Sequence, residues 1–121
     1  MNTLEIIDQF KDAIRAAGLP PPTHIEADGK LRRFSTNGKR NNTDGWYVLF
    51  GDGVAAGEFG CWRQGVRKKW CSRDYKILSS REREEYALCL VQIRAEREQD
   101  EKQRHEEARQ RANEIWNQAK E

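Results

Sequence analysis

A highly charged stretch, residues 94–111, constrains the fold of this chain more than any other feature. Its only apolar side chains are Ala95 and Ala108. A helix without an apolar stripe cannot bury one side in a hydrophobic core, so this stretch is expected to remain largely in water. Three pairs of opposite charge have the i,i+4 spacing that stabilises an exposed helix: Glu98–Lys102, Asp100–Arg104 and Glu107–Arg111.

A short apolar stripe precedes the charged stretch. It consists of Tyr86, Cys89, Leu90 and Ile93. Ser79 and Glu82 have the spacing of a capping box, so the helix is predicted to begin near residue 80. We expect a long helix that contacts the rest of the protein only through its first turns.

Residues 3–17 predict a second, amphipathic helix. Leu4, Ile7 and Ile14 recur at helical spacing, and Asn2 can cap the first turn. Gly18 and the three prolines that follow it predict the end of this helix.

Strands separated by turns are predicted between the two helices. In residues 45–50 both alternating faces are apolar, which indicates a central strand buried on both sides. The turn sequence at residues 27–30 predicts a hairpin that joins a strand near Ile25 to residues 30–34. In the next expected strand, Gly57 and Gly60 indicate a bulge or a close approach of two backbones.

The predicted fold class is therefore α+β. It has an N-terminal helix, an antiparallel sheet of about four or five strands, and a long charged C-terminal helix. We expect residues 1–93 to form a small nucleic-acid-binding-like domain and residues 94–121 to form a solvated helix or linker.

Charge is distributed unevenly along the chain. The net charge is +2, but residues 27–80 carry 11 basic and 5 acidic side chains, and both flanking segments are slightly acidic. Basic and aromatic residues interleaved in this way are typical of nucleic-acid binding, because the cations bind phosphates and exposed rings stack on bases. The candidate binding residues are Arg32, Arg33, Lys39, Arg40, Trp62, Arg63, Arg67, Lys68, Lys69 and Trp70. The alternative is that the aromatic residues form the core and the basic run is a solvated strand edge.

No metal, cofactor or catalytic site is predicted. The cysteines Cys61, Cys71 and Cys89 lack the paired spacing of a zinc knuckle and are too few and too scattered for a disulfide framework. No nucleophile elbow, phosphate-binding loop or metalloprotease motif is present. With no apolar segment of membrane-spanning length and no leader-like N-terminus, the expected location is the cytoplasm.

Several segments together resemble a known family. They are FKDAIRAAGLPPP (10–22), DGKLRRF (28–34), GKR (38–40), GWYVLF (45–50), FGCW (59–62) and ANEIW (112–116). They are similar to the N-terminal segment of phage- and plasmid-type DNA primase/helicase proteins, in which a Toprim catalytic domain follows. The resemblance implies a degenerate zinc-ribbon-like domain that helps the catalytic part to engage single-stranded template. Only Cys61 stands where a zinc-binding relative would carry a cysteine knuckle.

The sequence thus predicts a non-catalytic module that binds single-stranded DNA in a replication primase. Its other expected partners are a Toprim or helicase domain or another replication protein. The alternative is a protein-interaction module, or a small phage or mobile-element protein, that uses the helix and the sheet edge to bind a partner protein.

Overall fold

In chain order, the fold consists of an N-terminal helix, an antiparallel sheet and a long second helix. The computed structural model describes residues 2–39 and 42–120, without the side chains of residues 119 and 120. The elements are α1 (Thr3–Ala16), β1 (Arg32–Phe34), β2 (Gly45–Phe50), β3 (Ala56–Cys61), β4 (Val66–Cys71), the 3-10 helix η1 (Tyr75–Ile77) and α2 (Ser80–Lys120). The strands described form one antiparallel sheet in the order β1-β2-β3-β4. The predicted α+β class is confirmed.

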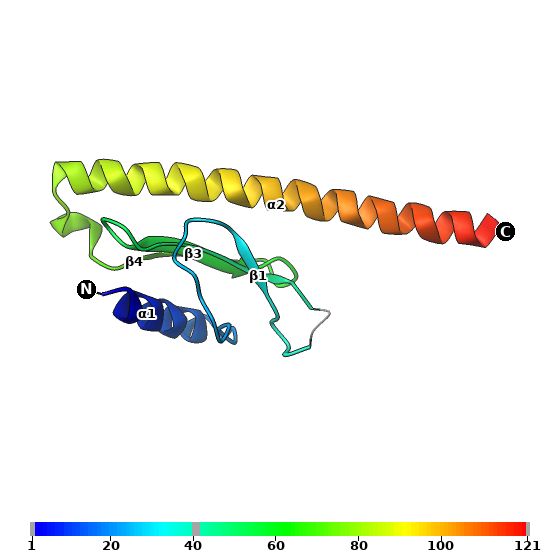
Figure 1. Cartoon of the computed structure of the whole chain (residues 1–121), viewed down its shortest axis with the longest axis horizontal. Helices are drawn as coiled ribbons and strands as arrows, with labels where there is room; N and C mark the ends of the chain where they lie inside the picture. Colours follow the sequence, from blue (N-terminus) through cyan, green and yellow to red (C-terminus); the bar gives the residue numbers. More distant parts are fainter. Residues whose placement is uncertain (1, 40–41, 121) are drawn as a thin grey trace.

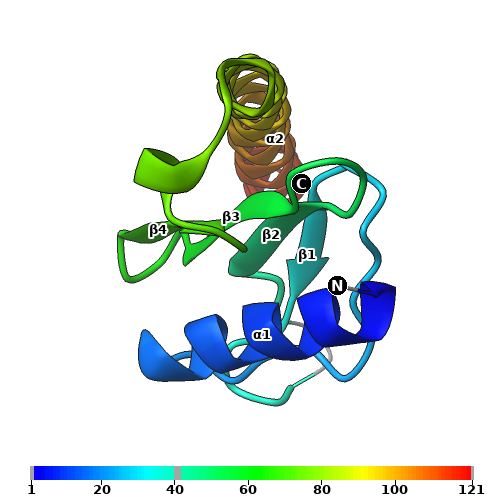
Figure 2. The ribbon, with the colours of Figure 1, turned by 90° about the vertical axis from the view of Figure 1, so that its left-hand side faces the viewer.

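The sheet lies between the two helices, which gives three layers (Figures 1 and 2). α1 covers one face of the sheet. α2 runs along the other face and continues beyond the sheet toward the C-terminus (Figure 1).

Both helices begin where the sequence predicts. Asn2 Oδ1 accepts a hydrogen bond of 2.9 Å from the Glu5 N–H at the start of α1. At the start of α2, the Ser79 hydroxyl and the Glu82 carboxylate each accept from the other residue's backbone N–H, both at 3.1 Å. This capping box satisfies two N–H groups that would otherwise lack partners. Gly18 adopts a φ of 85°, the left-handed conformation predicted for the end of α1.

β2 is the central strand and is buried on both faces, as predicted. Tyr47 and Leu49 point toward α1, whereas Trp46 and Val48 occupy the alternate face, toward α2. This arrangement requires a covering layer on each side of the sheet, and the two helices supply these layers.

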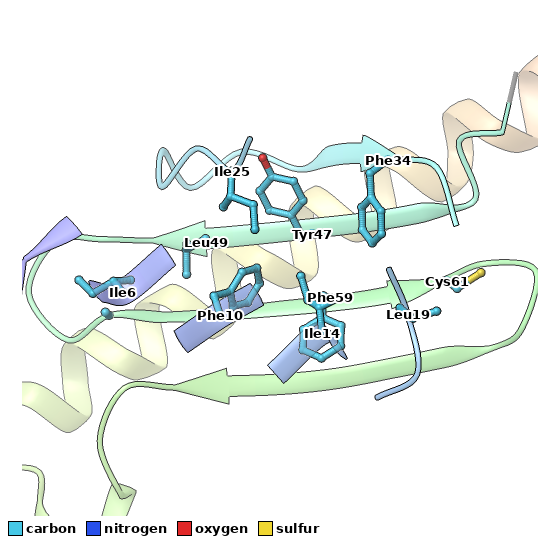
Figure 3. Packing of buried hydrophobic residues seen from close by; sticks show 11 residues of the cluster. Ile6, Phe10, Ile14, Leu19, Ile25, Phe34, Tyr47, Leu49, Phe59 and Cys61 are labelled. Atoms are coloured by element: carbon cyan, nitrogen blue, oxygen red, sulfur yellow. The ribbon is translucent and has the colours of Figure 1, made fainter. Parts of the chain in front are cut away.

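The main hydrophobic core lies between α1 and the sheet (Figure 3). Phe10 and Ile14 of α1 are completely buried. The Phe10 ring meets Phe59 edge to face at a centroid distance of 5.7 Å and Trp70 at 5.4 Å. Most of the apolar surface that stabilises the fold is therefore buried on this side of the sheet.

The predicted hairpin at residues 27–30 is wrong. The chain does turn there, with Gly29 at a φ of 73°, but Asp28 forms a bridge with Phe50 of β2. β1 has three residues and β2 has six, so β1 leaves the last part of β2 unpaired on that edge. Asp28 and Gly29 pair there instead, and the Gly29 N–H donates to the Leu49 carbonyl at 2.9 Å.

The glycines of β3 mark close backbone approaches, as predicted. A Cβ atom on Gly60 would lie 2.1 Å from the Val66 carbonyl oxygen, and one on Gly57 would lie 2.4 Å from that of Val48. No larger residue fits at either position without movement of the neighbouring strand.

The expectation that α2 docks only by its first turns is wrong. Ile93 is buried, and the next residues on the same side of the helix, Arg97, Asp100, Arg104 and Glu107, all make ion pairs with the sheet or its loops. The predicted pairs Asp100–Arg104 and Glu107–Arg111 give way to these contacts, because the sheet presents charges of the opposite sign. From residue 108 to residue 118 every side chain is exposed.

Within the part of the chain that the structure describes, neither helix has an apolar stretch long enough to cross a bilayer.

A core substitution tests the packing of α1 on the sheet. Replacing Ile14 with alanine should lower the free energy of unfolding by about 2–5 kcal/mol, because it leaves a cavity in the core. Urea unfolding followed by tryptophan fluorescence measures this change.

Leu4→Ala is the matched control on the same helix, because Leu4 is exposed. It should change the free energy of unfolding by less than about 0.5 kcal/mol. Equal effects of the two substitutions would contradict the packing described for α1.

Candidate nucleic-acid interface

A buried carboxylate on α2 binds two of the predicted DNA-binding residues. Asp100 is 7% exposed. Its Oδ1 accepts a hydrogen bond of 2.8 Å from Arg33 Nε, and its Oδ2 accepts one of 2.9 Å from Trp62 Nε1. The Trp62 ring stacks on Trp46, with the centroids 5.5 Å apart. Arg33 and Trp62 therefore hold α2 against the sheet.

The electrostatics of Arg33 fit this structural role. Its Nη2 is buried and lies 2.7 Å from Asp100 Oδ1, although without hydrogen-bond geometry, and its Nη1 lies 3.5 Å from Glu107. Burial lowers the pKa of Arg33, but the hydrogen bond from its guanidinium to Asp100 and the charges of both carboxylates outweigh burial and raise the pKa above its ordinary value. Arg33 is a cation already neutralised within the protein.

A second buried carboxylate, Glu58 of β3, joins β4 to α2. Glu58 is 2% exposed, and its Oε1 accepts a hydrogen bond of 2.9 Å from Arg97 Nη1. Arg67 Nε of β4 lies 3.0 Å from the same oxygen. Arg67 remains 51% exposed, so one side of its guanidinium is open to solvent. Glu58 thus holds two arginines at the floor of the space between β4 and α2.

That space is a groove of about 550 Å³. Its basic lining residues are Arg67, Lys69, Arg94 and Arg97, and its acidic ones are Glu58, Glu98 and Glu101. A neighbouring hollow of about 380 Å³ shares Arg67, Arg97 and Glu101 with the groove and is also lined by Trp62. We call the two together the β4–α2 groove. Four basic and three acidic side chains line it, and the Trp62 ring lies in the neighbouring hollow.

The remaining predicted residues do not gather with this groove. Arg32 forms ion pairs with Glu26, at 3.2 Å, and with Asp28. Burial raises the pKa of Asp28, but hydrogen bonds from Arg32 and from the Lys30 N–H outweigh it and hold the pKa below its usual value. Arg32 is therefore also paired within the protein.

The three consecutive basic residues of β4 lie on different faces of the sheet, because side chains alternate along a strand. Lys68 pairs in register with Phe59, so it lies on the α1 face, whereas Arg67 and Lys69 lie on the α2 face. Trp70 shares the α1 face with Lys68 and packs against Phe10.

The other predicted residues lie in loops. Lys39 and Arg63 are exposed, in the segment before β2 and in the β3–β4 turn respectively. Arg40 lies outside the described residues.

Arg94 and Arg97 were missed by the sequence analysis. They belong to the stretch that was expected to be a solvated arm, and their i,i+3 spacing places them on the same side of α2. The alternation of side chains along β4 could have predicted that Arg67 and Lys69 lie on a different face of the sheet from Lys68. The sequence could not predict that Arg94 and Arg97 line the same groove, because that depends on where α2 packs.

Among the described residues, no group of three or more histidine, cysteine or acidic side chains is arranged to hold a metal ion. Cys61 is buried in the core, and Cys71 and Cys89 are half-buried free thiols.

Comparison with known proteins shows a similarity to a primase. Over 108 residues the chain is 32% identical to DNA primase TraC of Escherichia coli, and the match covers 86% of this chain. The chain is primase-related. It spans about a tenth of the length of that primase. No family model matches the chain, and no solved structure matches it.

Removing the Asp100 carboxylate tests whether these contacts hold α2 in place. Asp100→Ala should lower the free energy of unfolding by about 3–5 kcal/mol, because it removes the nearest carboxylate of the largely buried Arg33 and leaves only Glu107, at 3.5 Å, to pair with it. Chemical denaturation followed by circular dichroism measures the loss.

Glu98→Ala is the control. Glu98 is exposed and pairs only with Arg94 of the same helix among the described residues, at 3.1 Å. It should change the free energy of unfolding by at most about 1 kcal/mol. If Asp100→Ala costs no more than Glu98→Ala, the buried cluster does not hold the helix.

Proposed function

We propose that this chain is a non-catalytic module that binds single-stranded DNA for a replication primase of the phage or plasmid type. The observation that carries the proposal is the β4–α2 groove, which is lined by four basic and three acidic side chains and has Trp62 in its neighbouring hollow. The similarity to DNA primase TraC supports the link to replication.

The chemistry of the groove suits a single strand. Proteins that bind single strands combine a basic channel, which follows the phosphates, with an aromatic ring on which a base stacks. In this proposal Arg67, Lys69 and Arg94 bind phosphates, and Trp62 offers the ring surface that is turned away from Trp46. Arg94 now pairs with Glu98, but both side chains are exposed, so Arg94 can exchange this partner for a phosphate at little cost. Glu58 neutralises part of the charge of Arg67 and Arg97, so these arginines are held in place before DNA arrives.

The proposed role in the cell follows from this site. The module would hold the template while a Toprim or helicase part of the primase acts on it, in the cytoplasm. It would take the place that a zinc-ribbon domain has in such proteins, with the sheet held by its two helices.

Salt dependence and variants of the groove test the proposal. Binding of a fluorescent oligothymidylate should weaken steeply between about 50 mM and about 200 mM salt, because phosphate contacts release counterions. Lys69→Ala and Arg94→Ala should each lower the affinity and reduce the slope of log K against log salt by about 0.7. Fluorescence anisotropy measures both quantities.

Arg15→Ala is the matched control, since it removes the same charge from an exposed position on α1, across the sheet from the groove. It should leave the slope unchanged. No binding at low salt, or equal losses in all three variants, would contradict the proposed site.

A further inference from the structure

The side of α2 that faces away from the sheet is a line of positions spaced three and four residues apart along the helix. These positions are Leu88, Val91, Ala95, Glu98, Lys102, His105, Arg109, Ala112 and Trp116. All nine are exposed, whereas Ile93 and Asp100, on the opposite side of the helix, are buried. We call these nine positions the outer seam of α2.

The outer seam is apolar at both ends and charged in the middle. Leu88 is 71% exposed, Val91 68% and Trp116 62%. Large apolar side chains that are mostly exposed along one line of a helix indicate a surface that another element covers. Because the charged positions lie between two apolar ends, the element that covers the seam should also be apolar at both ends and charged in the middle.

We propose that two copies of this chain pair through the outer seam, with their α2 helices antiparallel. In this alignment Val91 of one copy lies opposite Trp116 of the other, Ala95 opposite Ala112, and Glu98 opposite Arg109. The central layer, Lys102 opposite His105, is polar and fixes the register at some cost in affinity.

Charge decides the direction of the pairing. A parallel pair in register would place Glu98 against Glu98, Lys102 against Lys102 and Arg109 against Arg109, and each of these contacts is repulsive. The antiparallel pair replaces the first and last of them with attraction between Glu98 and Arg109. These two side chains now pair with Arg94 and Glu106 of their own helix, and such exposed pairs exchange partners at little cost.

The shape of the molecule permits this pairing. The sheet and α1 lie on one side of α2, as the end-on view shows (Figure 2), so the second copy approaches from the open side. The part of α2 that continues past the sheet (Figure 1) would lie over the first turns of α2 in the second copy. From Leu88 to Trp116 the contact would extend over about 40 Å of helix.

Molar mass in solution tests the pairing. In sedimentation velocity at about 0.1 mM protein, a dimer with a micromolar dissociation constant is the main species. The intact chain should then have twice its mass of 14.2 kDa. Leu88→Glu, which places a charge in the apolar end of the seam, should shift the chain to the monomer.

Gln110→Glu is the matched control, because it adds the same charge at an exposed position of α2 outside the seam. It should remain a dimer. A monomeric wild-type chain at this concentration would overturn the proposal, and so would equal dissociation of both variants. Either result would mean that the seam is exposed or serves a different partner.

Cross-linking tests the direction of the two helices. Two variants are made, one with Ala95→Cys and one with Ala112→Cys, and each is treated with a thiol oxidant. A disulfide should form efficiently when the two variants are mixed, and much less when either variant is oxidised alone. The chain has three cysteines of its own: Cys61 is buried, Cys71 and Cys89 are half-buried, and burial raises the pKa of the Cys89 thiol. The wild-type chain, oxidised in the same way, therefore measures the cross-linking that these cysteines contribute. Cross-linking of Ala95→Cys chains to one another as efficiently as in the mixture would overturn the antiparallel arrangement.

Discussion

Two buried carboxylates, Glu58 on β3 and Asp100 on α2, hold the long helix to the sheet and fix its position there. β2 is apolar on both faces, so the sheet needs cover on both sides. α1 covers one face with apolar side chains, whereas α2 covers the other largely through two ion pairs, Asp100 with Arg33 of β1 and Arg97 with Glu58 of β3. A buried pair of this kind costs little while intact and much when one partner is lost, so α2 has one defined position on the sheet. That position creates the β4–α2 groove.

Local chemistry could be predicted from the sequence, and long-range pairing could not. The caps at Asn2 and Ser79, the central strand β2 and the tight packing at Gly60 follow from residues close to one another in the chain, and all are confirmed. The docking of α2 depends instead on Arg33 meeting Asp100, 67 positions further on. The sequence alone does not distinguish a charged residue that pairs across the α2–sheet contact from one that faces water. For the same reason Arg33 was expected to bind DNA, and Arg97 was expected to be solvated.

α2 has three distinct sides in this account. One side binds the sheet through Ile93 and Asp100, and the flank beside β4 carries Arg94 and Arg97 into the groove. The outer seam faces away from the sheet and borders the groove at Val91 and Glu98. The long charged helix is therefore a structural layer, a proposed part of the DNA site and a proposed dimer contact. The two proposed surfaces share Val91 and Glu98, which line the groove, whereas Leu88, Ala95 and Ala112 of the seam lie outside the groove lining.

An NMR titration of the whole chain can show whether single-stranded DNA binds between β4 and α2, as we propose. Adding oligothymidylate to the ¹⁵N-labelled protein should shift the Trp62 indole N–H and the amides of β4 and of residues 94–101. The amides of α1, on the other side of the sheet, should stay in place. Shifts centred on α1 or on residues 108–118, or no shifts at low salt, would contradict the account.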